Sequence, residues 1–216
     1  MLTETTPFAA DHPKAAQRIA LESALAQAAL ALGARAQGLR SIVIRAGDFL
    51  GDAGSWMERA MGTRLAQGRF TRMGAADVPH AWAYLPDLAR VFVRVAEQRV
   101  RLDPHAVLHH AGITLTGSQM QAGFEAVLGR HLKPAARPWW LMRLPAPVAA
   151  MPRALMEMRH QRQRPHRQDE QRLNVLLAGR VPHTALLDVL PEALASLPGA
   201  GLPVSRAAAA PAWLKT

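Results

Sequence analysis

The sequence is short of several chemically useful residues, and each shortage narrows what the protein can do. Its 216 residues include no cysteine, which excludes disulfide bridges, thiolate metal ligands and cysteine nucleophiles. Lysine is scarce as well, because three of the 26 basic residues are lysines and the other 23 are arginines. Tyrosine occurs once, at Tyr84. The lack of cysteine fits a reducing compartment, and we expect a cytoplasmic protein.

Long apolar runs and targeting segments are missing too. A membrane-spanning helix needs about 20 consecutive, mainly apolar residues, and the sequence has no such stretch. The first residues, MLTETTPFAADHP, lack the basic segment and apolar core of a secretory signal. Since 50% of the residues are nevertheless hydrophobic, the composition predicts a globular chain that does not cross a membrane.

The charge of the chain is strongly positive, with a formal value of +10 at pH 7. Such a balance is typical of nucleic-acid binders. Abundant arginine together with abundant alanine, however, indicates a coding bias that raises the isoelectric point without selecting a partner. The most basic run, residues 159–172, has five arginines and two histidines but no aromatic side chains to stack on bases. Nucleic-acid binding therefore stays an alternative and not the leading interpretation.

Hydrophobic periodicity predicts helices and strands in alternation over roughly the first 130 residues. A strand that is apolar on both faces, as in a buried parallel sheet, is expected at 41–46, and a second at 106–112. Two strands are too few for a stable sheet, so others lie outside this interpretation or outside the chain. The expected helices cover 12–38, 55–68, 85–100 and 116–129, and residues 69–85 are expected to form a loop with short extended pieces.

This order predicts an α/β fold, with a parallel sheet flanked by helices and a helical lobe after it. We expect three parts along the chain. Residues 1–130 form the α/β domain, residues 131–197 form the helical lobe, and residues 198–216, rich in proline, glycine and alanine, form a loose tail.

A glycine-rich turn follows the first expected strand, in the sequence SIVIRAGDFLG. The glycines at 47, 51 and 54 match neither the dinucleotide fingerprint nor the phosphate-binding P-loop. Carboxylates at 48 and 52 would also oppose a bound pyrophosphate. A tight turn that needs glycine geometry explains Gly51 and Gly54. It leaves Arg45 and Asp48 unexplained at the carboxyl end of a strand, where α/β folds bind ligands.

Three segments, taken in order, carry a resemblance to a known family. Glu22 lies in the first helix, RAGDFLG ends the first strand at residues 45–51, and YLPDLA opens a later helix at residues 84–89. Their order and spacing over residues 1–130 resemble the C-terminal half of an extended short-chain dehydrogenase/reductase of the NAD-dependent epimerase/dehydratase type. That family has Y-x-x-x-K with Glu four residues later, a strand ending in R-P-x-x-x-x-G-P, and a V-x-D-x-A segment.

The resemblance implies a partial Rossmann-like fold, a cofactor that is NAD or NADP, and a small-molecule substrate. Counting back from Glu22 puts Lys14 at the family's catalytic tyrosine and Arg18 at its lysine, so the usual acid–base pair is replaced. The family's glycine-rich first half should precede this region, which makes the chain a C-terminal portion that pairs with a complementing half or forms a homodimer. The resemblance also implies that five residues bind the cofactor near its nicotinamide end: Arg45, Ala46, Gly47, Asp48 and Phe49.

Other residues have both a functional and a structural interpretation. Trp56, Trp82 and Trp139 are candidate walls of a substrate pocket, and for Trp139 the alternative is packing within the helical lobe. Lys14 and Arg18 could simply form an exposed basic helix face. His109 and His110 point to opposite faces of a strand and have no third ligand at metal-binding spacing, so we expect core or loop-end histidines and no metal.

Three functions follow for testing. The leading one is an NAD(P)-dependent oxidoreductase-like or epimerase-like protein, present here as its C-terminal portion. The second is a non-catalytic module that uses the same fold to bind a dinucleotide or a partner chain. The third is a non-specific nucleic-acid binder.

Overall fold

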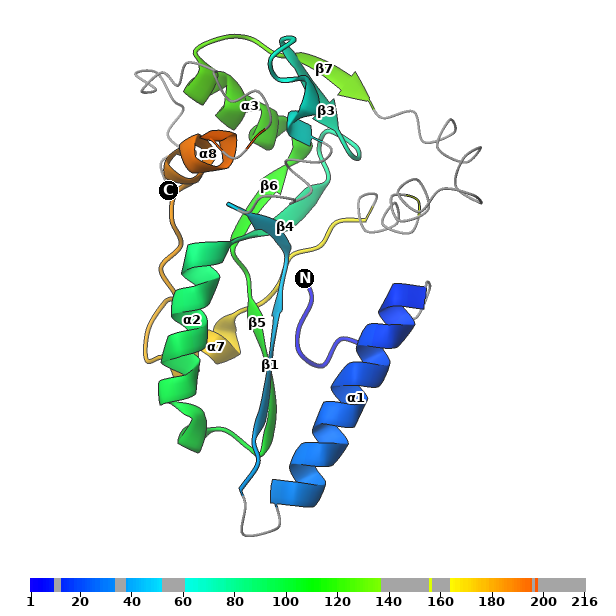
Figure 1. Ribbon diagram of the computed structural model, residues 1–216, viewed down its shortest axis with the longest axis vertical. Coiled ribbons are helices and arrows are strands. Elements are labelled where there is room, and N and C mark those ends of the chain that lie inside the picture. The colour runs from blue at the N-terminus through cyan, green and yellow to red at the C-terminus, as the bar shows by residue number, and fades with distance from the viewer. Residues whose placement is uncertain are drawn as a thin grey trace.

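The computed structural model (Figure 1) describes residues 1–9, 13–33, 38–51, 61–136, 156, 164–195 and 197. Helices and parallel strands are mixed along the chain, and the predicted α/β class is confirmed. The main elements are α1 (Pro13–Gly33), β1 (Ser41–Ala46), β2 (Asp48–Leu50), β3 (Arg69–Arg72), β4 (Pro79–Tyr84), α2 (Leu85–Glu97), β5 (His105–His110), β6 (Ile113–Thr116), α3 (Gly117–Leu128), β7 (Lys133–Ala136), α7 (Gln171–Leu176) and α8 (Leu186–Ala195). Two short 3-10 helices, η2 (Gly62–Arg64) and η3 (Arg99–Arg101), complete them.

The predicted helix ends agree with the local chemistry. Helix α1 ends at Gly33, and α2 has Pro86 in its first turn, where the missing backbone N–H costs nothing. Thr116 caps α3 through a capping box: its Oγ1 accepts from the Gln119 N–H at 3.1 Å, and the Gln119 side chain accepts from the Thr116 N–H at 2.9 Å.

The two predicted strands pair with each other. β1 and β5 run parallel, from Ser41 opposite His105 to Ala46 opposite His110. Five further strands were not predicted. β2 pairs with β4 in parallel, β4 pairs with β6 antiparallel, and β3 pairs with β7 in parallel. The region 69–85, expected as a loop with short extended pieces, thus contains two paired strands, β3 and β4.

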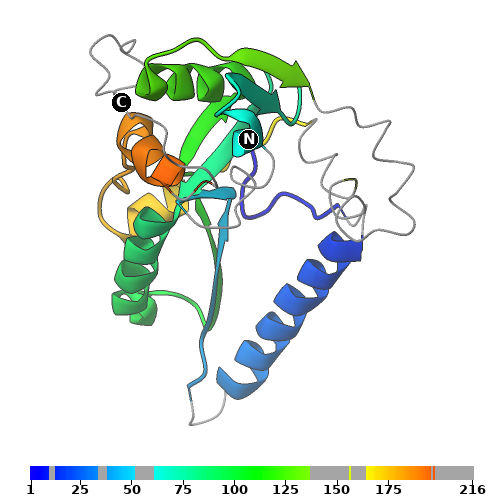
Figure 2. The same ribbon diagram turned by 45° about the horizontal axis from the view of Figure 1, so that its top comes forward.

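The β1–β5 sheet lies between helices (Figures 1 and 2). Helix α1 lies along one side of it, and α2 and α7 lie on the other. Helices α3 and α8 pack together near β3, β4 and β6, at the end of the molecule away from the lower turn of α1. The β1–β5 sheet therefore has helices on both faces, as parallel sheets do, but all six β1 residues are only partly buried.

Two apolar clusters form the described core. The larger one joins β4 and β6 to α3 and α8, and includes Phe70, Phe124 and Leu190 at 0% exposure. The smaller one joins α2 and β5 to α7, with Leu108 and Leu173 at 0% exposure. Both clusters contain residues from either side of residue 130, the expected domain boundary.

Some expectations fall on parts of the chain outside the described residues. The tail 198–216 belongs to this group, as do residues 55–60 and part of the helical lobe expected at 131–197. The described part of the helix expected at 55–68 forms the short 3-10 helix η2 followed by a turn, so no regular α-helix continues through it. None of the described helices has the length and apolar character that a membrane crossing requires.

Candidate functional site

The turn after β1 moves the chain from one sheet to another, and glycine makes this possible. β1 pairs with β5, whereas β2 pairs with β4, so the crossing occurs at Gly47. A Cβ atom at Gly47 would overlap the carbonyl oxygen of Ala81 on β4. Gly51 has φ +82°, a conformation that side chains disfavour. The backbone therefore explains Gly51 by turn geometry and Gly47 by close approach, while Gly54 lies outside the described residues.

A cleft of about 650 Å³ opens at the carboxyl end of β1. Its walls come from α1, the N-terminal segment and the strands β1 and β5, together with Leu88 and Phe92 of α2. Four residues predicted for the site line it: Arg18, Arg45, Ala46 and Phe49. The other lining side chains that matter for its chemistry are Phe8, Glu22, His109, His166 and Gln168.

The remaining predicted residues lie elsewhere. Lys14 is exposed on the first turn of α1 and is not in the cleft wall. Asp48 is 7% exposed on β2, opposite Trp82 in register. Trp82 lies in the larger apolar cluster at 2% exposure, beside a cavity of only about 20 Å³. Trp56 and Trp139 lie outside the described residues, so all three tryptophan pocket walls remain predictions.

Arg45 is the main charged group in the cleft, and Glu22 holds it in place. Its Nη2 donates to Glu22 Oε2 at 2.6 Å, and its Nε donates to both carboxylate oxygens at 3.2 Å. The guanidinium carbon lies 4.6 Å from the ring centre of Phe8. Among the described residues Nη1 makes no hydrogen bond, so two N–H groups of a fixed guanidinium remain for an anionic ligand.

Arg18 adds a second positive charge. It precedes Glu22 by one turn of α1 and lines the same cleft. Residues four apart share a helix face, so Arg18, Glu22 and Arg45 form one cluster with a net charge of about +1. Because a guanidinium stays protonated, Arg18 can bind an anion but cannot exchange protons with a substrate.

A neutral histidine lies beside these charges. His109 is opposite Arg45 in the β1–β5 register and lines the cleft. Its Nδ1 lies 3.2 Å from the carbonyl oxygen of Leu2. Burial lowers the pKa of His109, outweighing Glu4 and the Leu2 hydrogen bond, which raise it. At pH 7 His109 is therefore an uncharged hydrogen-bonding group near the arginines.

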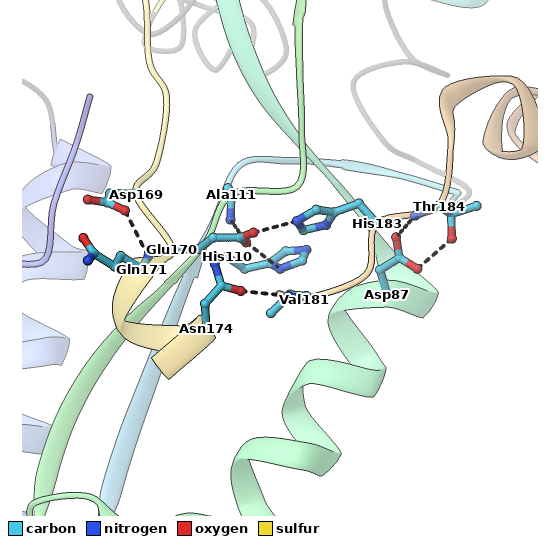
Figure 3. Close-up of polar contacts among 10 residues, drawn as sticks. All are labelled: Asp87, His110, Ala111, Asp169, Glu170, Gln171, Asn174, Val181, His183 and Thr184. Atoms are coloured by element: carbon cyan, nitrogen blue, oxygen red, sulfur yellow. Dashed lines mark hydrogen bonds and ion pairs between the residues drawn. The ribbon is translucent and has the colours of Figure 1, made fainter. Parts of the chain in front are cut away.

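The opposite face of β5 presents a different cluster (Figure 3). His110 turns away from the cleft because neighbouring strand residues point to opposite faces, and it approaches Glu170 and His183. His183 Nε2 lies 2.8 Å from Glu170 Oε1, and the backbone N–H of Ala111 donates to Glu170 Oε2 at 3.0 Å. His110 Nδ1 lies 4.0 Å from Glu170 Oε2.

The ionisation of this cluster follows from its burial. His110 is completely buried, and desolvation followed by the charge of His183 lowers its pKa to about 4. Burial alone would raise the pKa of Glu170, but hydrogen bonds from His183 and Ala111, with the charges of both histidines, lower it overall. Sequence reasoning placed His110 in a strand but missed its partners, which come 60 and 73 residues later.

Comparisons with known proteins give a fold and no family assignment. No protein-family model matches the sequence, and no curated protein matches it. Solved structures do match. L-threonine 3-dehydrogenase from Trypanosoma brucei has a TM-score of 0.66 at 14% identity, over 94% of this chain and 59% of its own.

Two UDP-glucose 4-epimerases match similarly. The enzyme from Stenotrophomonas maltophila, solved with bound NAD and formylated UDP-arabinopyranose, has a TM-score of 0.62 at 14% identity, covering 89% of this chain and 56% of its own. The enzyme from Brucella ovis, in complex with NAD, has a TM-score of 0.59 at 16% identity, covering 89% and 57%.

The chain thus spans little more than half the length of the solved structures that it matches. At these identities the likeness concerns the fold alone. The described chain has a Rossmann-like α/β fold that resembles part of the NAD-dependent epimerase/dehydratase structures.

Proposed function

We propose that this chain is the C-terminal portion of an NAD(P)-dependent oxidoreductase or epimerase, and that its cleft binds the anionic cofactor or a nucleotide-linked substrate. The observation that carries the proposal is the 650 Å³ cleft at the carboxyl end of β1, into which Arg45 presents a guanidinium anchored by Glu22. This is the end of a parallel strand at which α/β folds bind ligands. Matching structures contain NAD and UDP-linked sugars, which are both anionic.

The proposed roles divide between the two arginines and the cleft wall. Arg45 is held by hydrogen bonds to both carboxylate oxygens of Glu22 and directs Nη1 to phosphate or carboxylate oxygens of the ligand. Arg18, exposed on α1, supplies a second positive charge. Ala46 and Phe49 provide apolar wall on the strand side, and His109 offers a neutral donor or acceptor. Lys14 lies one turn before Arg18 on α1. We keep it as a proposed site residue, at the outer end of the same helix face.

Binding has more support than catalysis. A proton shuttle needs a group that titrates near the working pH and reaches the substrate. Tyr84 donates a hydrogen bond from its hydroxyl group to Glu192 and is not among the residues that line the cleft. Among described residues the cleft wall contains arginines, a paired glutamate and histidines, but it has neither the tyrosine nor the lysine that form the acid–base pair of the family resembled. This observation favours the second candidate, a non-catalytic module that binds the same class of ligand without turnover.

Binding measurements test the proposal directly. Calorimetric titration of the chain with NAD⁺, NADH, NADP⁺, NADPH and UDP-glucose should give saturable binding of at least one ligand. The Arg45→Gln/Glu22→Gln double variant should bind at least about 10-fold more weakly, since hydrogen bonds to charged groups contribute about 1.5–3 kcal/mol. Changing both partners avoids leaving Glu22 unpaired.

Arg40→Gln is the matched control. Arg40 precedes β1, is exposed, and donates to the carbonyl oxygen of Leu102 outside the cleft. It should leave ligand affinity unchanged. Absence of binding to all five ligands would refute the proposal, whereas binding without change in NAD(P)H absorbance on addition of sugars or ketones would select the non-catalytic module.

The exposed apolar surface of α1 suits an interaction with a partner chain beside the cleft. Leu21, Leu25 and Leu30 are 60%, 39% and 63% exposed, and among the described strands β1 pairs with β5 alone. An open strand edge beside exposed leucines fits a docking surface. We propose that either a complementing half of the fold or a second copy of the chain covers it.

A further inference from the structure

We infer that His110, Glu170 and His183 form a binding site for one divalent transition-metal ion, for which Zn²⁺ is the best-suited occupant. The site lies on the face of β5 opposite the cleft (Figure 3) and is independent of the function proposed above.

Three segments distant in sequence converge at this point. His110 ends β5, Glu170 directly precedes α7, and His183 lies in the segment between α7 and α8. One ligand atom from each lies within 4.8 Å of the other two. His183 Nε2 and Glu170 Oε1 are already 2.8 Å apart. Ligand bonds of about 2.0–2.2 Å place ligand atoms roughly 3–4 Å from one another, so a small adjustment of His110 completes the set.

The burial of His110 points independently to a missing ligand. Its side chain is 0% exposed, and within the described residues neither ring nitrogen makes a hydrogen bond. The Nδ1 atom of His183 is also buried without a hydrogen-bond partner there. Buried polar atoms are nearly always satisfied, because an unsatisfied one costs free energy. A metal ion would use the lone pair of His110 that the protein leaves unused.

The ligand types favour zinc over harder cations. Two imidazole nitrogens with one carboxylate oxygen suit Zn²⁺, whereas Mg²⁺ and Ca²⁺ prefer oxygen ligands. Three protein ligands leave a fourth position for water. The surroundings also stabilise the ligands, as expected around metal sites. The Ala111 N–H orients Glu170, and Asp87 accepts from the N–H and hydroxyl of Thr184, the residue after His183.

The position indicates a structural role for the ion. His110 faces away from the cleft and towards the smaller apolar cluster. A bound ion would join the end of β5 to the segments that carry α7 and α8. Metal binding to the native state alone would then stabilise the fold by mass action.

The test uses the full chain with Zn²⁺ and, as a spectroscopic probe, Co²⁺. We expect one equivalent of each to bind in calorimetry, visible Co²⁺ absorption bands of a low-coordinate site, and an unfolding temperature that rises with Zn²⁺. The variants His183→Ala and Glu170→Gln should each lose at least about 100-fold in affinity, since even outer-shell partners contribute about 10–100-fold. Both side chains are partly exposed, at 22% and 15%, so the folded state should tolerate the changes.

His131→Ala is the matched control. His131 also pairs with a glutamate, Glu125, at 3.0 Å, but it is 78% exposed and remote from this cluster. It should bind both metals like the wild type. Equal affinity in wild type and His183→Ala, or no binding by the wild type, would overturn the inference. Circular dichroism of each apo variant separates loss of ligand from loss of fold.

Discussion

The two ends of this molecule differ sharply in how completely their apolar residues are packed. Around α3 and α8, Phe70, Phe124, Val189 and Leu190 are all 0% exposed. Along the 21 residues of α1, by contrast, Ala29 is the single buried residue, and Leu21 and Leu30 are more than half exposed. The same chain therefore contains a completely packed region around α3 and α8, called the finished core below. It also contains a region, α1 with β1, whose apolar side chains stay largely exposed or only partly buried, called the unfinished layer below.

The residues proposed to bind an anionic ligand lie in the unfinished layer. Arg18 and Glu22 belong to α1, and Arg45 belongs to β1, whose residues are all only partly buried. The α3–α8 region contributes stability but no described wall of the large cleft. The most completely buried apolar side chains therefore lie away from the cleft proposed to bind an anionic ligand.

The largest expected effect comes from a cavity in the finished core. Phe124→Ala should lower the free energy of unfolding by about 3–5 kcal/mol, because Phe124 is fully buried and contacts the ring of Phe70 at 5.5 Å between centroids. Leu21→Ala on α1 should change it by no more than about 0.5 kcal/mol. Urea unfolding followed by circular dichroism measures both. Similar losses in the two variants would remove the contrast between the regions.

A second effect concerns the hydrogen bond between Tyr84 and Glu192, which links β4 to α8. Tyr84→Phe should cost about 1.5–3 kcal/mol, the range for hydrogen bonds to charged groups. The hydrogen bond to Glu192, then burial and the Glu192 charge, raise the pKa of Tyr84 from 10.0 to about 12. Below pH 10 both folded and unfolded chains keep the phenol proton, and this stabilisation is fully present. It is lost as pH rises from about 10 to 12, because the unfolded chain deprotonates first.

The single tyrosine makes this titration unambiguous. Tyrosinate absorbance in the native chain reports Tyr84 alone, and its midpoint should lie near 12. Glu192→Gln should move the midpoint back towards 10 while preserving the side-chain shape. A native midpoint at the ordinary tyrosine value would show that the Glu192 contact does not persist in solution.

The longer elements could be predicted from the sequence because local chemistry defines them. The strand expected at 41–46 and the helices expected from residues 85 and 116 match β1, α2 and α3. β2, β3 and β7 have three or four residues each, too few to show a period. β4 was hidden because five of its six residues are buried, so its pattern does not alternate between apolar and polar.

The site was harder to predict than the fold. Glu22 and Arg45 were both singled out, but their pairing depends on α1 packing against β1, which local patterns do not encode. His110 was assigned to a strand correctly, yet Glu170 and His183 meet it only through the placement of α7. Contacts between residues 60 or more positions apart depend on tertiary packing, and a single sequence does not reveal them.

A smaller effect tests the start of α3. Thr116→Ala removes the hydroxyl that caps the Gln119 N–H, so the free energy of unfolding should fall by about 1 kcal/mol. Thr116→Ser keeps the hydroxyl and should lose much less. Denaturant titration separates the two. Equal losses would mean that the methyl group, rather than the cap, carries the effect.

The last prediction concerns the exposed leucines of α1, whose substitution should hardly change stability but should abolish association between chains. Leu21→Gln/Leu25→Gln changes exposed positions of α1, so the free energy of unfolding should stay within about 0.5 kcal/mol of the wild type. If α1 and the open edge of β1 form a docking surface, the wild type should show concentration-dependent association in sedimentation velocity, and this variant should not. Val100→Gln, at a residue 71% exposed on η3, changes a comparable apolar surface elsewhere and should associate like the wild type. A variant that still associates would show that the exposed leucines of α1 are not the contact surface.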